Sequence, residues 1–185
     1  MTSKIDICSN ALQLVGDNPI SSFTESDSAA LAENLYDQFY ESQLSYHPWG
    51  FALKQQKLNL LTEKPDTMTN YSHAFQLPTD LVFLWNIQPY SSYEIIGDLI
   101  YSNSNQLLAT YTHKVNESQL PSYFVTMMQY KMASEFAQTV TENGGLAQLY
   151  EQKYRMELGA AQAIDSKQRP QMGILDQPYL QVRNY

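Results

Sequence analysis

The stretch ICSNALQLVG (residues 7–16) decides how this chain begins to fold. Its apolar residues recur every three or four positions, which is the spacing of one helix face, and Gly16 supplies a helix terminator. A second, longer helix is expected after the Ser/Asp-rich residues 24–28, because hydroxyl and carboxylate groups there can cap its free amides. Pro48 ends that helix inside the stretch HPWGFA (residues 47–52).

This second stretch gathers aromatic side chains where the long helix stops. We expect Pro48, Trp49 and Phe51 to form a structural corner that fixes the helix end over the core. Trp and Phe beside a chain reversal can also form a stacking platform for a ligand. The corner is favoured here, and the ligand pocket stays open as an alternative.

From residue 53 the apolar pattern changes from helical to alternating, and turn residues appear between short runs. This predicts a small antiparallel β-sheet domain over residues 53–117. Gly97 marks a tight hairpin, because glycine adopts the positive φ of a primed turn without steric cost. The last three strands are expected to form a meander. The predicted strands are residues 55–61, 73–76, 81–88, 93–96, 99–102 and 106–113.

Helical periodicity returns over residues 118–168 and is interrupted at Asn143, Gly144 and Gly145, which predicts two more helices. The expected fold class is therefore α+β. It comprises a four-helix bundle of two antiparallel pairs (residues 1–52 and 118–168), the inserted sheet domain and an extended C-terminal arm (residues 169–185).

The arm is too apolar for a solvated tail, yet prolines and a glycine prevent a continuous helix. Burying four of its apolar side chains would contribute roughly 6–12 kcal/mol before ordering costs. The arm is expected to lie on a surface, either across its own domain or on a neighbouring subunit or partner. Its candidate docking residues are Met172, Ile174, Leu175, Tyr179, Leu180, Val182 and Tyr185.

Tyrosine is unusually frequent, with 14 in 185 residues, and tyrosine is enriched where proteins meet proteins. Tyr90, Tyr93, Tyr101 and Tyr111 fall in or beside the predicted strands. Because successive residues of a strand face opposite sides, some of these four should point outward. They are the candidates for contacts with another subunit or a tail protein, and ordinary strand composition is the alternative.

Composition excludes several function classes. The 19 acidic and 11 basic residues give a net charge of −8 without a Lys/Arg cluster, so the chain is not expected to grip nucleic acid. No apolar run reaches the ~20 residues of a membrane span, and synthesis in the cytoplasm is expected. The single Cys8 allows no intrachain disulfide, and His47, His73 and His113 lack metal-ligand spacing. No cofactor, metal site or catalytic residue is predicted.

Several short motifs follow one another in a recognisable order, and together they span most of the chain. They resemble the head-to-tail adaptor proteins of short-tailed bacteriophages, the tail tubular protein A family. The motifs are LVG (14–16), SAAL (28–31), PWGFA (48–52), YSHAFQLPTD (71–80), IGDLIY (96–101), LATY (108–111), LPSYF (120–124) and ASEFA (133–137).

The resemblance implies a non-enzymatic virion protein at the head–tail interface. Members of that family form a dodecameric ring between the portal protein and the distal tail tube or nozzle. DNA passes through the ring without specific binding during genome ejection. The resemblance also implies that the C-terminal arm docks on the portal.

Two other function classes stay open. A tail-associated cell-wall hydrolase needs two carboxylates, and the acidic pairs Glu25/Asp27, Asp37/Glu41 and Glu151/Glu157 are its candidates, although solvated helix faces explain them better. A helical regulator that binds DNA is the weaker option, since it would require salt-sensitive affinity for DNA.

Overall fold

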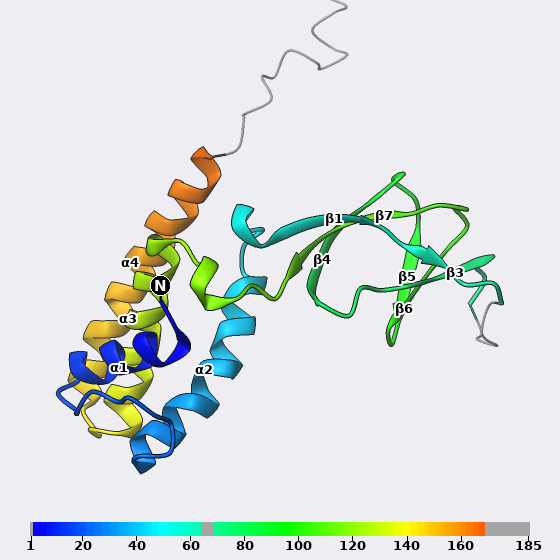
Figure 1. The fold of residues 1–185 in the computed structure, drawn as a ribbon. Coiled ribbons are helices and arrows are strands. Elements are labelled where there is room, and N and C mark those ends of the chain that lie inside the picture. Colours follow the sequence, from blue (N-terminus) through cyan, green and yellow to red (C-terminus); the bar gives the residue numbers. More distant parts are fainter. Residues whose placement is uncertain (1, 64–68, 169–185) are drawn as a thin grey trace, which may run out of the picture.

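The computed structural model of this protein describes residues 2–63 and 69–168. The described residues form two parts that stand side by side in Figure 1. The helical lobe comprises residues 2–52 and 114–168, and the β lobe comprises the described residues between them. Two short 3₁₀ helices, η1 (Gly50–Ala52) and η2 (Glu117–Gln119), lie close to the two junctions between the lobes.

The first two helices begin at capped positions. α1 (Lys4–Leu14) starts with a capping box: the Ser3 hydroxyl accepts from the amide of Asp6, whose carboxylate accepts from the amide of Ser3. Gly16 follows with a φ of +88°, a left-handed conformation that favours glycine. α2 (Asp27–Ser45) is capped at its first turn by a serine hydroxyl. The sequence therefore predicted where these two helices begin and where α1 ends.

The last two helices form an antiparallel hairpin. α3 (Ser122–Thr139) buries a broad face that includes Phe124 and Phe136. α4 (Gly144–Lys167) begins directly after Asn143, whose side-chain oxygen accepts from the amide of Leu146 at 3.0 Å. The two glycines that break the helical pattern thus lie in the first turn of α4.

The prediction of a four-helix bundle is wrong, although the α+β class agrees with the structure. α3 packs against α4 and α1, whereas α2 diverges from the α3–α4 pair toward the β lobe (Figure 1). The helices are unequal: α1 has 11 residues and α4 has 24, or roughly 17 and 36 Å at 1.5 Å per residue. A regular bundle needs helices of matching length. Here α2 packs its tyrosines against the chain entering α3, where the Tyr40 hydroxyl donates to the carbonyl of Val115 at 2.7 Å.

The β lobe contains two antiparallel sheets instead of the predicted single small sheet. The three-stranded sheet has the order β1-β7-β4, and the four-stranded sheet has the order β2-β3-β6-β5. Their side chains enclose a second core, separate from the core of the helical lobe. The strands are β1 (Leu53–Lys57), β2 (Asn59–Leu60), β3 (His73–Gln76), β4 (Leu81–Gln88), β5 (Tyr93–Ile96), β6 (Leu99–Ser102) and β7 (Leu108–His113).

The predicted three-strand meander is also wrong beyond its first hairpin. β5 and β6 pair around Gly97 as expected, with φ +64° at the glycine. The other edge of β6 is occupied by β3, where Phe75 lies opposite Ile100. β7 instead lies between β1 and β4 in the other sheet. β6 and β7 follow each other in the sequence, but each pairs with a strand from a more distant part of the chain and not with the other.

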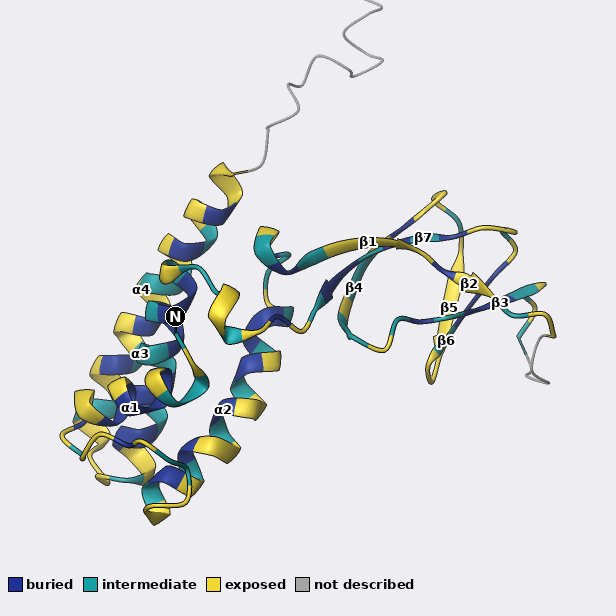
Figure 2. Ribbon diagram, in the orientation of Figure 1, coloured by how far each residue is buried: buried dark blue, intermediate teal, exposed yellow. Residues whose placement is uncertain are grey.

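Burial divides each lobe into a core and a polar outer face, as Figure 2 shows for the helices, whose dark buried stripes face one another. A search of the described residues finds no helix that is long and apolar enough to cross a membrane.

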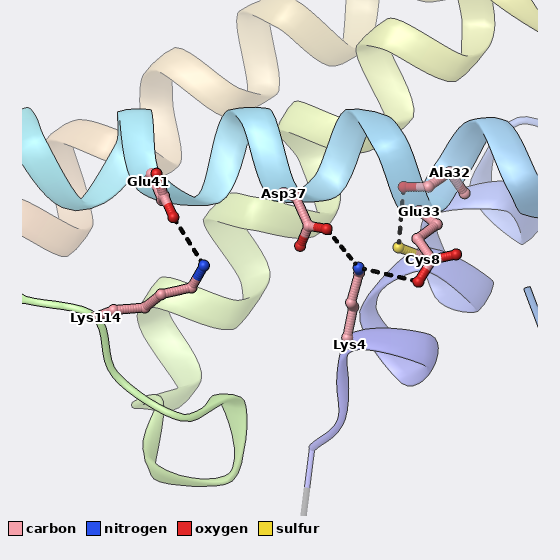
Figure 3. A network of polar contacts seen from close by, with 7 residues as sticks. All are labelled: Lys4, Cys8, Ala32, Glu33, Asp37, Glu41 and Lys114. Carbon is pink, nitrogen blue, oxygen red and sulfur yellow. Dashed lines mark hydrogen bonds and ion pairs between the residues drawn. The ribbon is translucent and has the colours of Figure 1, made fainter. Parts of the chain in front are cut away.

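A row of carboxylates follows one exposed side of α2 (Figure 3). Lys4 Nζ lies 2.9 Å from Asp37 and 3.5 Å from Glu33, and Lys114 Nζ lies 2.7 Å from Glu41. The three acids are four residues apart and so share a helix face. Exposed pairs of this kind contribute only about 0–1 kcal/mol each, so this row matters mainly for surface charge.

Cys8 provides a first test of the packing. Its side chain is fully buried, with Sγ 3.8 Å from the carbonyl oxygen of Ala32, and burial raises the pKa of the thiol to about 12. Because the thiolate is the reactive form, the native protein should resist Ellman's reagent at pH 8 and react fully once it is denatured. Complete labelling of the native protein within minutes would contradict this packing.

Candidate interaction surface

Two of the four candidate contact tyrosines are buried. Tyr101 on β6 is 1% exposed and Tyr111 on β7 is fully buried. Only some of the four were expected to point outward, and these two are not among the outward-facing ones. Tyr101 lies in an interior strand whose neighbouring residues, Ile100 and Ser102, are also fully buried, so both faces of that strand are covered.

Tyr111 is held by polar contacts inside the β lobe. Its hydroxyl oxygen lies 3.0 Å from the carboxylate of Asp80 and 3.1 Å from the side-chain oxygen of Gln56. Burial, followed by the contact with Asp80, raises the pKa of Tyr111 to about 12. Asp80 also accepts from Lys54 at 2.6 Å, and the hydrogen bonds from Lys54 and Tyr111 lower the pKa of Asp80. This tyrosine therefore stabilises the lobe from within.

The other two tyrosines are exposed. Tyr90 is 97% exposed, in the connection between β4 and β5, and Tyr93, the first residue of β5, is 41% exposed. Phe83 on β4 and Ile95 on β5 are exposed to a similar degree, at 42% and 45%. The Phe83 ring lies 4.6 Å from the ring of Trp85, centroid to centroid.

Trp85, Tyr90 and Tyr93 line a groove of about 480 Å³. The Trp85 indole nitrogen donates to Thr112 Oγ1 at 2.7 Å, which fixes that ring. Ile87 and the uncharged polar side chains of Asn86, Ser91 and Ser92 complete the lining, so the groove carries no formal charge. We refer to Phe83, Trp85, Tyr90, Tyr93 and Ile95 as the β-lobe apolar surface.

Strand β5 borders this surface and is an edge of its sheet. Within the described part of the chain its one strand partner is β6, and all four of its residues are exposed. Ile96 is 41% exposed and faces the side opposite Tyr93 and Ile95, so the strand is apolar on both faces. Sequence reasoning identified the strand but not its edge position, because no local signal tells which neighbour a strand lacks.

The surroundings of this edge are acidic. Residues 65–113 contain no lysine or arginine, while Glu94 lies within β5 and Asp98 lies in the turn that follows it. The carboxylate of Asp98 accepts from the side-chain amide of Gln76 at 2.8 Å. A partner that carries positive charge would therefore meet complementary charge here.

The predicted corner lies inside the helical lobe and not on the β lobe. Trp49 is fully buried, and its indole nitrogen donates to the carbonyl of Gln43 at 2.9 Å. Its ring meets Phe124 edge-on at 5.2 Å, and Phe51 lies 6.0 Å from it. Pro48 and Phe51 are half-buried. Because Trp49 has no exposed area, it presents no platform to a ligand.

A buried carboxylate that sequence reasoning missed completes this corner. Asp165 of α4 is fully buried and accepts from the amide of Gly50 at 2.9 Å and from the hydroxyl of Tyr123 at 3.1 Å. The Nε2 atom of His47 lies 3.3 Å from it. Burial and the neighbouring carboxylate raise the pKa of Tyr123 to about 12. Asp165 thus joins α4 to the corner, η1 and α3, which are distant in sequence.

The acidic pairs considered for hydrolysis lie on helix surfaces and caps. Asp37 and Glu41 bind lysines, Glu151 accepts from Arg155 at 2.9 Å, and Glu25 accepts from the amides of two serines, Ser21 and Ser22. Within residues 2–63 and 69–168, no group of three or more His, Cys, Asp or Glu side chains is arranged to hold a metal ion.

The predicted docking arm, residues 169–185, lies outside the described residues. No protein-family model matches the chain, and no curated protein matches it. The geometry of the two lobes and the motif resemblance are therefore the basis for a functional proposal.

Proposed function

We propose that this protein is a head-to-tail adaptor of a short-tailed bacteriophage. Its copies form a ring, dodecameric as in the family that it resembles, between the portal and the distal tail tube or nozzle. In this proposal the protein is part of the virion, has no catalytic role, and reaches the portal through its C-terminal arm. The observation that carries the proposal is the β-lobe apolar surface, in which Trp85, Tyr90 and Tyr93 share one groove, Phe83 packs on Trp85, and exposed aromatic area of the kind buried in assemblies is gathered.

The placement of this surface supports an assembly role. It lies on the β lobe, away from the hairpin of α3 and α4 that forms the centre of the helical lobe (Figure 1). A ring built from identical subunits needs two different surfaces on each copy, so that one copy can bind the next head to tail. Two lobes with separate cores can supply two such surfaces.

Charge supports passage of DNA without retention. The chain carries a net charge of −8, and the row of Glu33, Asp37 and Glu41 on α2 faces solvent and pairs with Lys4 and Lys114 (Figure 3). Like charges repel phosphates, and a channel lined in this way would not hold DNA. A basic lining would instead slow its transit.

Truncation of Tyr90 tests the assembly role. Because Tyr90 is 97% exposed, a Tyr90→Ala protein should fold normally but lose aromatic contact area at the interface. Native mass spectrometry, alone and with a purified portal ring, should show a ring on the portal for the unchanged protein and severalfold weaker assembly for the variant.

Tyr46→Ala is the matched control, since Tyr46 is 60% exposed on the helical lobe and should assemble normally. A strictly monomeric protein that ignores the portal would refute the adaptor proposal. Hydrolysis of purified cell wall by the intact protein would favour the hydrolase instead.

A further inference from the structure

Among the described residues, one edge of strand β5 has no strand paired with it. A strand edge exposes unpaired amide and carbonyl groups, and natural proteins usually block it with lysine, proline, a bulge or an inward-pointing charge. Residues 93–96 contain no lysine or proline, and their pairing with β6 is continuous. Two of the four side chains are isoleucines, on opposite faces of the strand.

The chemistry of this edge specifies what would pair with it. An added strand forms main-chain hydrogen bonds with β5, and its side chains must match apolar groups on both faces. It must also place a positive charge near Glu94, because residues 65–113 supply none. An extended, partly apolar segment with an arginine meets these needs.

The same chain contains such a segment beyond the described residues. Residues 169–185 hold two of the three arginines of the protein and only one acidic residue, Asp176. Within them the order Leu180, Gln181, Val182, Arg183 alternates apolar and polar side chains with a period of two. This stretch therefore has the pattern of a strand and the charge that complements β5.

We propose that residues 181–184 of one copy add as an antiparallel strand to β5 of a neighbouring copy in the ring. In the register that we infer, Val182 lies opposite Ile95, and Arg183 lies opposite Glu94. Apolar and opposite-charge pairs of this kind stabilise adjacent strands. A parallel arrangement that kept Arg183 beside Glu94 would place Asn184 against Ile95 instead.

The donor is a second copy because donor and acceptor lie on different lobes. α4 ends in the helical lobe, whereas β5 lies in the β lobe (Figure 1). Residues 169–180 can span up to roughly 40 Å when extended, which allows a reach between neighbours. Donation from one lobe to the other lobe of the next copy is a head-to-tail contact, the type that closes rings. The inference rests on the proposed ring and leaves Met172, Ile174 and Leu175 for the portal.

Disulfide trapping between full-length copies tests the register. Chains carrying Ile95→Cys are mixed with chains carrying Val182→Cys, with and without a portal ring, and oxidised. Directly opposed strand residues have Cβ atoms about 4.5–5.5 Å apart, near enough for a disulfide to form with a small shift. A covalent dimer should appear in the mixture and not with either variant alone. The buried Cys8 should take no part.

Gln181→Cys is the matched control, because it is one residue out of register with Ile95 and faces the other side. Glu94→Arg should reduce the trapped dimer severalfold, and adding Arg183→Glu in the donor should restore it. Equal trapping by Gln181→Cys and Val182→Cys, or no trapping in any mixture, would overturn the inference. Rings that still form on the portal without trapping would refute the strand donation alone, whereas trapping without portal binding would refute the adaptor function alone.

Discussion

Replacing Trp49 by alanine is expected to lower the free energy of unfolding by about 3–5 kcal/mol. The side chain is fully buried, so its removal leaves a cavity among the rings of Phe124, Phe51 and Tyr123. It also leaves the carbonyl of Gln43 without its indole donor. Urea denaturation followed by circular dichroism measures the loss, and a helical lobe near its stability limit would unfold at room temperature.

The variant Trp49→Phe separates packing from hydrogen bonding. Phenylalanine keeps most of the apolar area but not the donor to Gln43, so we expect a smaller loss than for alanine. A Trp49→Ala protein that is as stable as the original and fails only in ring assembly would contradict the structural role of the corner. Such a result would assign Trp49 to a contact surface.

Replacing Asp165 by alanine should have the second large effect. The change leaves the amide of Gly50 and the hydroxyl of Tyr123 without their acceptor in a partly buried site. A buried orphaned donor costs about 1–3 kcal/mol, and these two are partly buried, so we expect a loss of about 2 kcal/mol with roughly 6 kcal/mol as the upper limit. Thermal and urea denaturation of the purified variant provide the measurement.

Tyr123→Phe is the control for Asp165, because it removes one donor and keeps the carboxylate and its contact with Gly50. We expect it to lose about 1 kcal/mol. If Asp165→Ala were no less stable than Tyr123→Phe, the carboxylate would not hold the corner. A variant at Gly50 would be less informative, since an added Cβ would lie 3.3 Å from Asp165 and would confound packing with hydrogen bonding.

The local elements of the fold could be predicted because their signals are local. Caps, stop residues and apolar periodicity placed the helices, and alternation with turn residues placed β3, β4, β5 and β6 with the bounds that the structure has. Gly97 marked the tight hairpin that joins β5 and β6. Each of these signals lies within a few residues of the element that it defines.

The arrangement of these elements could not be predicted in the same way. Nothing near residues 99–102 indicates that β3 takes the free edge of β6, and this pairing buries Tyr101. Nothing near Asp165 distinguishes it from the exposed acids of α4, since its partners, Gly50 and Tyr123, lie far away in the sequence. The unequal helix lengths argued against a bundle, but the divergence of α2 depends on contacts with Val115 and β4.

The pairing of β1 with β7 has an evolutionary consequence. Leu53, where the chain enters the β lobe, lies opposite Thr112, where the chain prepares to leave it. The entry and exit points are therefore one strand spacing apart, about 5 Å. A segment whose ends meet so closely can be shortened, lengthened or exchanged while α2 and α3 stay in place. The β lobe could in this sense be exchanged as a unit without moving the ends of the helices that flank it.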